Sequence, residues 1–98
     1  MHAKDVAKII QKMINEDKFY NMNIATEENY TVDYIAKLAL EACDAQHLKI
    51  VYDKSKPNGQ LRKDIEISRL KKYFSDFLPI SLTDGIKEIY NKKIKTYE

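Results

Sequence analysis

Hydrophobic and polar positions follow a helical period over two stretches in the first half of the chain. Residues 3–15 place apolar side chains three and four positions apart, with lysines on the opposite side, which predicts an amphipathic helix. Residues 32–43 repeat this spacing. Thr31 precedes them as a good N-cap, and Asp33 lies in the first turn, where an acidic side chain favours the helix dipole.

Two further helices are predicted in the second half of the chain. Ser68 is placed to cap a helix of one to two turns that runs through Leu70 to Phe74. Residues 81–94 form the last helical pattern, opened by Ser81 with an acid three positions later, close to a capping box.

Three segments have the alternation or the β-branched content that is typical of strands. They are Phe19–Ile24, Leu48–Tyr52 and the short stretch from Ile65 to Ile67. The order of the elements is therefore that of a small α+β unit, with helices, a few short strands and no complete Rossmann sheet.

The length of 98 residues, with 44% apolar and 33% charged residues, indicates one small soluble domain. It is too short for a dinucleotide-binding domain together with a substrate domain, because domains run to roughly 100–200 residues each. Two glycines and two prolines argue against disorder and against a turn-rich all-β fold. We therefore expect residues 1–98 to form a single domain.

Compartment and membrane contact are addressed by the cysteine count and by the apolar runs. No apolar run approaches the roughly 18 residues that span a bilayer, and the amino terminus does not resemble a signal peptide. Cys43 is the only cysteine, so no internal disulfide can form, which fits a reducing compartment. We expect a cytoplasmic protein without a membrane partner.

The net charge of +2 conceals an uneven distribution. Residues 1–48 carry five lysines against eight acidic residues, a net charge of −3, whereas residues 49–98 carry twelve basic against seven acidic residues, a net charge of +5. A local basic patch suggests an anionic ligand, although a solvated lysine-rich face has the same composition. The aromatic residues are not interleaved with the basic ones, so we do not expect nucleic-acid binding.

The basic residues gather around an irregular segment, residues 53–63. Its Pro-Asn-Gly sequence at 57–59 is strong turn chemistry, because proline presets φ and Asn-Gly tolerates positive φ. We expect this turn to bring four cations together: Lys54, Lys56, Arg62 and Lys63. An arginine fork and mobile lysine charges together suit a diphosphate, and an ordinary surface turn is the equal alternative.

Other candidate chemistry fails on geometry or on ligand number. Tyr52 and Lys56 have the Tyr-x-x-x-Lys spacing of a dehydrogenase acid, but that spacing needs a helix, and here it runs from a predicted strand into a turn. Cys43 and His47 lie four residues apart, without the second pair that a zinc site requires. Glycine-rich phosphate loops and nucleophile elbows are also missing from the sequence, so we expect no catalytic residues and no metal ligands.

A family resemblance begins at this basic segment. Residues 53–63 read Asp-Lys-Ser-Lys-Pro-Asn-Gly-Gln-Leu-Arg-Lys, which resembles the Asp-x-Ser-Lys-Pro-Asp-Gly-x-x-Arg-Lys signature of GDP-L-fucose synthases. Residues 23–26 (Asn-Ile-Ala-Thr) are similar to the Asn-Ile-Gly-Thr-Gly segment of the family, and residues 2–7 are similar to its His-x-x-Asp-Val-Ala stretch. Residues 67–70 and 80–90 are also similar to family segments. The resemblance covers nearly the whole chain, but only the C-terminal third of the family's length.

GDP-L-fucose synthases are extended short-chain dehydrogenases that epimerise and reduce a GDP-4-keto-6-deoxyhexose. The resemblance implies a C-terminal substrate-binding lobe that contacts the nucleotide-sugar diphosphate and is not catalytic alone. Lys63 matches the diphosphate contact of the family, and Arg62, Lys56 and Gly59 shape or share that contact. The resemblance further implies that the parent enzyme uses NADP or NAD, that its cofactor domain is absent from this chain, and that it is a homodimer.

Several positions depart from the family pattern. Asn58 replaces an aspartate, Leu61 stands where proline is common, and Ala25 and Glu27 replace two glycines. These changes fit a divergent nucleotide-sugar epimerase or reductase as well as a fucose synthase. The alternative is a stand-alone, non-enzymatic binding or interaction module derived from this domain. We also expect self-association through the helix at residues 3–15, whose apolar face would lack its partner domain.

Overall fold

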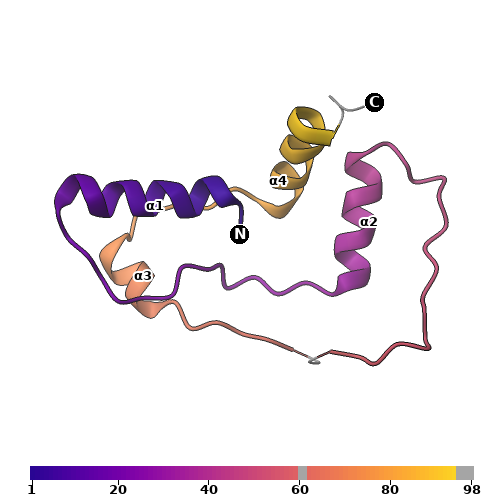
Figure 1. The fold of residues 1–98 in the computed structure, drawn as a ribbon, viewed down its shortest axis with the longest axis horizontal. Coiled ribbons are helices and arrows are strands. Elements are labelled where there is room, and N and C mark those ends of the chain that lie inside the picture. The colour runs from indigo at the N-terminus through magenta and orange to yellow at the C-terminus, as the bar shows by residue number, and fades with distance from the viewer. Residues whose placement is uncertain (60–61, 95–98) are drawn as a thin grey trace. The chain divides into compact units, whose positions relative to one another are not determined.

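The computed structural model describes residues 1–59 and 62–94, and the chain divides into two compact units. The first unit combines Met1–Glu28 with Ile65–Leu82, and the second combines Asn29–Asp64 with Thr83–Glu98. The chain therefore leaves the first unit, builds most of the second, returns to complete the first, and ends in the second (Figure 1).

Helix α1, Ala3–Glu16, lies in the first unit and confirms the first predicted helix. His2 caps it, since its Nδ1 atom accepts a hydrogen bond from the backbone N–H of Lys4 at 3.0 Å. The helix ends at Asp17, which takes a left-handed conformation with φ of 52° and donates its N–H to the carbonyl of Ile14 at 3.2 Å. The left-handed residue ends the helix because it turns the chain back, so that the next N–H, that of Lys18, donates to the carbonyl of Met13 at 3.0 Å.

The core of the first unit is small. Five apolar side chains are buried in it, from α1, from the chain after it and from α3: Ile9, Ala25, Ile67, Leu70 and Phe74. Partly buried side chains pack around them, and Tyr20 stacks on Tyr73 with ring centroids 3.9 Å apart. This cluster holds α1 against the short helix α3, because both helices bury apolar side chains in it.

Helix α3, Ser68–Tyr73, confirms the predicted short helix but not its predicted cap. Ser68 is the first helical residue, and Ile67 stands at the N-cap without a side-chain hydrogen bond. The free N–H of Ser68 is satisfied instead by the Glu66 carboxylate at 2.6 Å. A carboxylate two residues upstream therefore takes the role that the sequence pattern assigned to the serine hydroxyl.

Helix α2, Val32–Ala42, lies in the second unit and begins as predicted. The Thr31 hydroxyl accepts a hydrogen bond from the N–H of Tyr34 at 3.1 Å, which caps the helix. None of its side chains is buried, although its sequence is rich in apolar residues. Tyr34 stacks on Tyr30 with ring centroids 5.2 Å apart, which packs the entry of the helix against its first turn.

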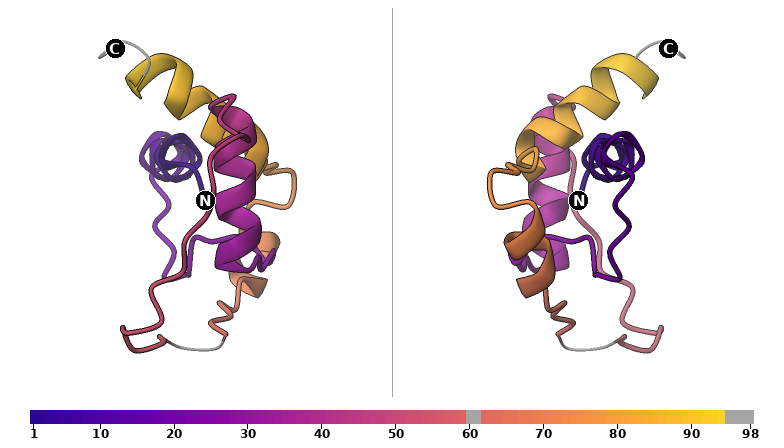
Figure 2. Two further views of the ribbon diagram at one scale, coloured as in Figure 1. Left: turned by 90° about the vertical axis from the view of Figure 1, so that its right-hand side faces the viewer. Right: turned by 90° about the vertical axis from the view of Figure 1, so that its left-hand side faces the viewer.

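Helix α4, Leu82–Ile89, starts directly after Ser81 and continues as a π-helical turn, Tyr90–Ile94. Its beginning and its extent confirm the predicted last helix. α2 and α4 lie side by side within the second unit (Figures 1 and 2). Gly85 is the buried residue of α4.

The predicted strands are not formed, so the α+β prediction is wrong for the described part of the chain, which is helical without strands. In place of a ladder, the Asn23 amide donates to the carbonyl of Glu66 at 3.0 Å, and the Arg69 guanidinium donates to the carbonyl of Asn21 at 2.9 Å. These side chains use the backbone acceptors that neighbouring strands would share. The segment at 48–52 has no strand partner in the described part of the chain, and its Val51 is 81% exposed.

Across residues 1–59 and 62–94, none of the helices combines the length and the apolar character that crossing a membrane requires.

Candidate functional site

The basic segment at residues 53–63 belongs to the second unit and connects α2 to α3 without regular secondary structure in its described part (Figures 1 and 2). Gln60 and Leu61 lie outside the described residues. All four predicted site residues, Lys56, Gly59, Arg62 and Lys63, are exposed. Within the described residues, no hydrogen bond or ion pair joins any two of these four residues.

The segment opens with a turn, but earlier than predicted. The Asp53 carboxylate accepts hydrogen bonds from the Ser55 hydroxyl at 2.6 Å and from the Ser55 N–H at 3.0 Å. These two bonds hold the pKa of Asp53 below its usual value, because they stabilise the charged form. The chain turns at residues 54–55 and bends at Lys56, directly before the Pro-Asn-Gly sequence.

The Pro-Asn-Gly sequence itself is not the site of the turn, which corrects the prediction from turn chemistry. Gly59 does not take a positive φ, and a Cβ atom added to it would meet nothing within 4 Å. The turn forms earlier in the chain instead, where the Asp53 carboxylate accepts two hydrogen bonds from Ser55. Neither space nor backbone conformation therefore requires glycine at position 59.

Lys56 and Lys63 form no hydrogen bond or ion pair with another residue in the described part of the chain. Arg62 is different, since its Nε atom lies 2.8 Å from Oδ2 of Asp64. Both side chains of this pair remain largely exposed. Lys54 has no such partner either, so the described part of the segment offers three uncommitted ammonium groups and one guanidinium that is held by a carboxylate.

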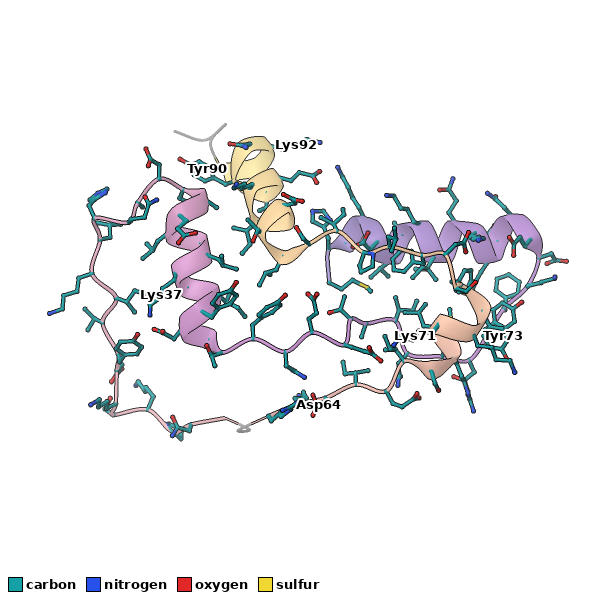
Figure 3. All side chains as sticks on the ribbon, turned by 180° about the vertical axis from the view of Figure 1, so that it is seen from behind. Lys37, Asp64, Lys71, Tyr73, Tyr90 and Lys92 are labelled. Atoms are coloured by element: carbon teal, nitrogen blue, oxygen red, sulfur yellow. The ribbon has the colours of Figure 1, made fainter. Side chains whose placement is uncertain are left out.

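A tether lies at each end of the basic segment, and both attach it to the chain around the start of α2. At the upstream end, the Tyr52 hydroxyl donates a hydrogen bond to Oδ1 of Asp33. At the downstream end, the Asn29 amide donates a hydrogen bond to Oδ1 of Asp64. Figure 3 shows Asp64 on the chain that leads toward α3. Because Asn29 and Asp33 are only four residues apart, the two ends of the segment are attached to one short stretch of chain.

The upstream tether is part of a three-residue network. Lys37, on α2, lies 2.8 Å from Oδ2 of Asp33, one helical turn away (Figure 3). The Lys37 ammonium, followed by the Tyr52 hydroxyl, holds the pKa of Asp33 below its ordinary value. The Asp33 carboxylate in turn raises the pKa of Tyr52 and that of Lys37. A tyrosine whose pKa is raised in this way suits a tether and not a proton donor at neutral pH.

The two tethers were not identified from the sequence. The pattern pairs Tyr52 with Lys56, whereas the structure pairs Tyr52 with Asp33. Asn29 and Asp64 are 35 positions apart, and no local spacing rule joins residues at such a separation. The sequence shows only a polar residue, Asn29, shortly before the helix cap and an acid, Asp64, directly after two basic residues. These features are too common to predict that the two residues meet.

A cavity of about 430 Å³ lies in the first unit, whereas the predicted site residues belong to the second. Buried side chains of Ile67, Leu70 and Phe74 contribute to its lining, and an ion pair between Lys71 and Glu27, 2.6 Å between Nζ and Oε1, lies at its polar side. Lys71 and Tyr73 both belong to α3 (Figure 3). Its volume is within the range of small-molecule sites, but none of the four predicted residues lines it.

Within the residues that the structure describes, no group of three or more His, Cys, Asp or Glu side chains is arranged to hold a metal ion. Comparisons with protein-family models, with curated proteins and with solved structures found no match for this chain.

Proposed function

We propose that this chain is the C-terminal, nucleotide-sugar-binding part of an NAD(P)-dependent epimerase or reductase resembling GDP-L-fucose synthase. In this proposal the basic segment contacts the diphosphate of a sugar nucleotide, and the chain is not catalytic alone. The observation that carries the proposal is the state of Lys56 and Lys63. These two cations are exposed, they have no partner in the described part of the chain, and they lie in a segment that is tethered at both ends.

The charge of the segment suits a diphosphate. Each lysine ammonium is a mobile point charge that hydrogen-bonds phosphate oxygens, and charge-assisted bonds of this kind are the stronger ones. Tethered ends restrict the free segment, so less conformational freedom is lost when the anion binds. Affinity of the isolated chain is expected to be low, because the base and sugar contacts of such an enzyme come from elsewhere in it.

The helix positions add support that is independent of the basic segment. In the resemblance, a helix follows the segment that corresponds to residues 23–26, and another begins at the segment that corresponds to residues 80–82. α2 begins after Thr31 and α4 begins at Leu82, in the corresponding places. The parent enzyme would supply NADP or NAD and the catalytic residues from its other domain, would act in the cytoplasm and would form a homodimer.

A second candidate is a stand-alone, non-enzymatic binding or interaction module derived from this domain. The observation in its favour is that the first unit has its own buried core, built from α1, the chain directly after it, and α3 with its flanking residues. Sequencing the gene upstream of the Met1 codon separates the two proposals. A continuous reading frame with a glycine-rich cofactor loop and a helical Tyr-x-x-x-Lys supports the enzyme, and an in-frame stop codon supports the module.

The diphosphate contact is tested by isothermal titration of the 98-residue chain with GDP-mannose and with inorganic pyrophosphate, at low and at physiological salt. We expect Lys63→Ala to weaken both affinities about three- to tenfold, because an exposed charge-assisted contact is lost. Lys49→Ala is the matched control, since it removes the same charge from an exposed lysine outside the segment. The proposal is wrong if the wild-type chain binds neither ligand, or if the two variants weaken binding equally.

A further inference from the structure

Asp64 occupies a central position at the downstream end of the basic segment. Its Oδ2 atom lies 2.8 Å from Nε of Arg62, and its Oδ1 atom accepts a hydrogen bond from the Asn29 amide. One carboxylate therefore connects the arginine to the chain just before α2. Without this connection, the arginine would share the rotational freedom of an ordinary exposed side chain.

The contact with Asp64 uses only the Nε atom of Arg62, so the two terminal nitrogens of its guanidinium remain available to bind a phosphate. A guanidinium has five N–H donors in a fixed plane, one on Nε and four on the two terminal nitrogens. Asp64 engages Nε, and the terminal nitrogens of Arg62 make no hydrogen bond in the described part of the chain. A terminal pair of N–H donors is the fork that binds a phosphate through two parallel hydrogen bonds.

Charge alone predicts the opposite role for Asp64. A carboxylate next to Lys63 repels an incoming anion, and an exposed acid usually lowers the affinity of a phosphate site. The two effects of Asp64, repulsion and positioning, therefore change affinity in opposite directions. This opposition makes the role of the residue decidable by the sign of one measurement.

We propose that Asp64 is a positioning residue of the diphosphate site, which holds the Arg62 guanidinium through Nε so that its terminal N–H groups bind a phosphate oxygen pair. Asn29 fixes the Asp64 carboxylate in this role. The inference rests on the proposed function, and it assigns Arg62 as a direct phosphate ligand beside Lys56 and Lys63. The resemblance supplied no role for Asn29 or Asp64.

The test is the affinity of the 98-residue chain for inorganic pyrophosphate, measured by isothermal titration at fixed ionic strength. We expect Asp64→Ala to weaken binding about two- to fivefold although it removes a negative charge, since exposed ion pairs contribute little each. Asp64→Asn keeps a carbonyl acceptor for Nε and should retain most of the affinity. Glu41→Ala is the matched control, because it removes an exposed acid from α2 and should leave binding unchanged or slightly tighter.

The decisive comparison repeats Asp64→Ala in an Arg62→Ala background. With the arginine gone there is nothing to position, so the same substitution should now tighten binding by relieving repulsion. A tightening of binding by Asp64→Ala in the wild-type background overturns the inference and leaves the proposed function standing. Loss of the difference between Lys63→Ala and Lys49→Ala overturns the proposed function, and the inference falls with it.

A ligand-free readout checks the geometry separately. Hydrogen exchange of the Arg62 Nε–H, followed by nitrogen-15 NMR, should be slowed in the wild type and should speed up in both Asp64→Ala and Asn29→Ala. An Asn29→Ala variant that exchanges like the wild type would overturn the role of Asn29. An Asp64→Ala variant that exchanges like the wild type would overturn the positioning role itself.

Discussion

The carboxylate of Asp5 accepts a hydrogen bond from the backbone N–H of Ile80, 2.9 Å away and 75 residues later in the chain. Asp5 is fully buried in the first turn of α1, where the helix dipole favours its negative charge. Its second oxygen has no hydrogen-bond donor in the described part of the chain. The single bond therefore joins the two sequence-distant pieces of the first unit, the start of α1 and the chain that precedes α4.

Removing this carboxylate should destabilise the first unit. We expect Asp5→Ala to lower the free energy of unfolding by about 1–3 kcal/mol, because the Ile80 N–H loses its acceptor. Asp5→Asn keeps a carbonyl acceptor and should lose less. Urea unfolding followed by circular dichroism measures both, and Asp76→Ala, at an exposed acid of the same unit, should change stability by less than about 0.5 kcal/mol. Equal effects of Asp5→Ala and Asp76→Ala would contradict the prediction.

The small core makes the first unit sensitive to single truncations. Ile9 is 2% exposed and lies among the five buried apolar residues, so Ile9→Ala should cost about 2–4 kcal/mol. Ile9→Val removes one methylene and should cost about 0.5–1.5 kcal/mol, which keeps the loss measurable in a domain of low stability. Leu78→Ala is the control, since Leu78 is 86% exposed and should contribute little. A loss at Leu78 as large as that at Ile9 would show that the core lies elsewhere.

The Tyr52–Asp33 tether should respond to pH at both extremes. The pKa of Asp33 lies below its ordinary value of 3.8, so its contribution to stability is present above that pH and is lost as the pH falls through the lowered pKa. The pKa of Tyr52 lies above its ordinary value of 10.0, so its contribution is present below that pH and is lost as the pH rises through the raised pKa.

The tether is checked by NMR titration of the tyrosine rings and the carboxyl carbons. Tyr52→Phe should shift the pKa of Asp33 upward only in part, because the hydrogen bond from Lys37 is the larger cause of its lowering. Lys37→Ala should shift it further. Tyr20→Phe serves as the control, since Tyr20 lies in the first unit and its ring contacts are with Tyr73 and Phe74. A Tyr52 that titrates at its ordinary value would rule out the tether.

Self-association through α1 remains a prediction with a defined surface. Ile10 is 44% exposed and Ile14 is 61% exposed, one turn apart on α1, whereas the neighbouring Ile9 is buried. Ile14→Lys should therefore weaken association without affecting the core. Sedimentation across a wide concentration range measures it, with Gln11→Lys as the control that adds the same charge to a polar position of α1. A wild-type chain that stays monomeric throughout that range would refute the prediction.

The resolved helices are the part of the fold that the sequence predicts well. The apolar spacing of α1 and α2 and the Thr31 cap involve residues within four positions of one another, which is the range that a sequence pattern records. The strand predictions failed because a strand needs a hydrogen-bonded partner, and composition alone cannot provide one. At residues 21–23 and 66–69 the side chains of Asn23 and Arg69 take the bonds that a ladder would use.

The candidate site also has a part that the sequence predicts and a part that it does not. The basic residues and their exposure follow from a short stretch of sequence, but their partners do not. The Pro-Asn-Gly sequence predicted a turn that Asp53 and Ser55 form instead, three residues earlier. The pairing of Arg62 with Asp64 is local and could have been weighed from the sequence, since opposite charges two residues apart often interact. The hydrogen bond from Asn29 to Asp64 could not have been weighed in this way, because the two residues are 35 positions apart.

By itself, the sequence determined the helices, the exposed basic segment and the resemblance on which the proposed function rests, because each depends on residues near one another in the chain. The tertiary structure decided which polar groups are paired with a distant partner. It buried Asp5 against Ile80, tied Tyr52 to Asp33, and placed Asp64 between Asn29 and Arg62. The physical reason is that a buried or tethered polar group is stabilised by partners 19 to 75 residues away, and their approach depends on how the whole chain packs.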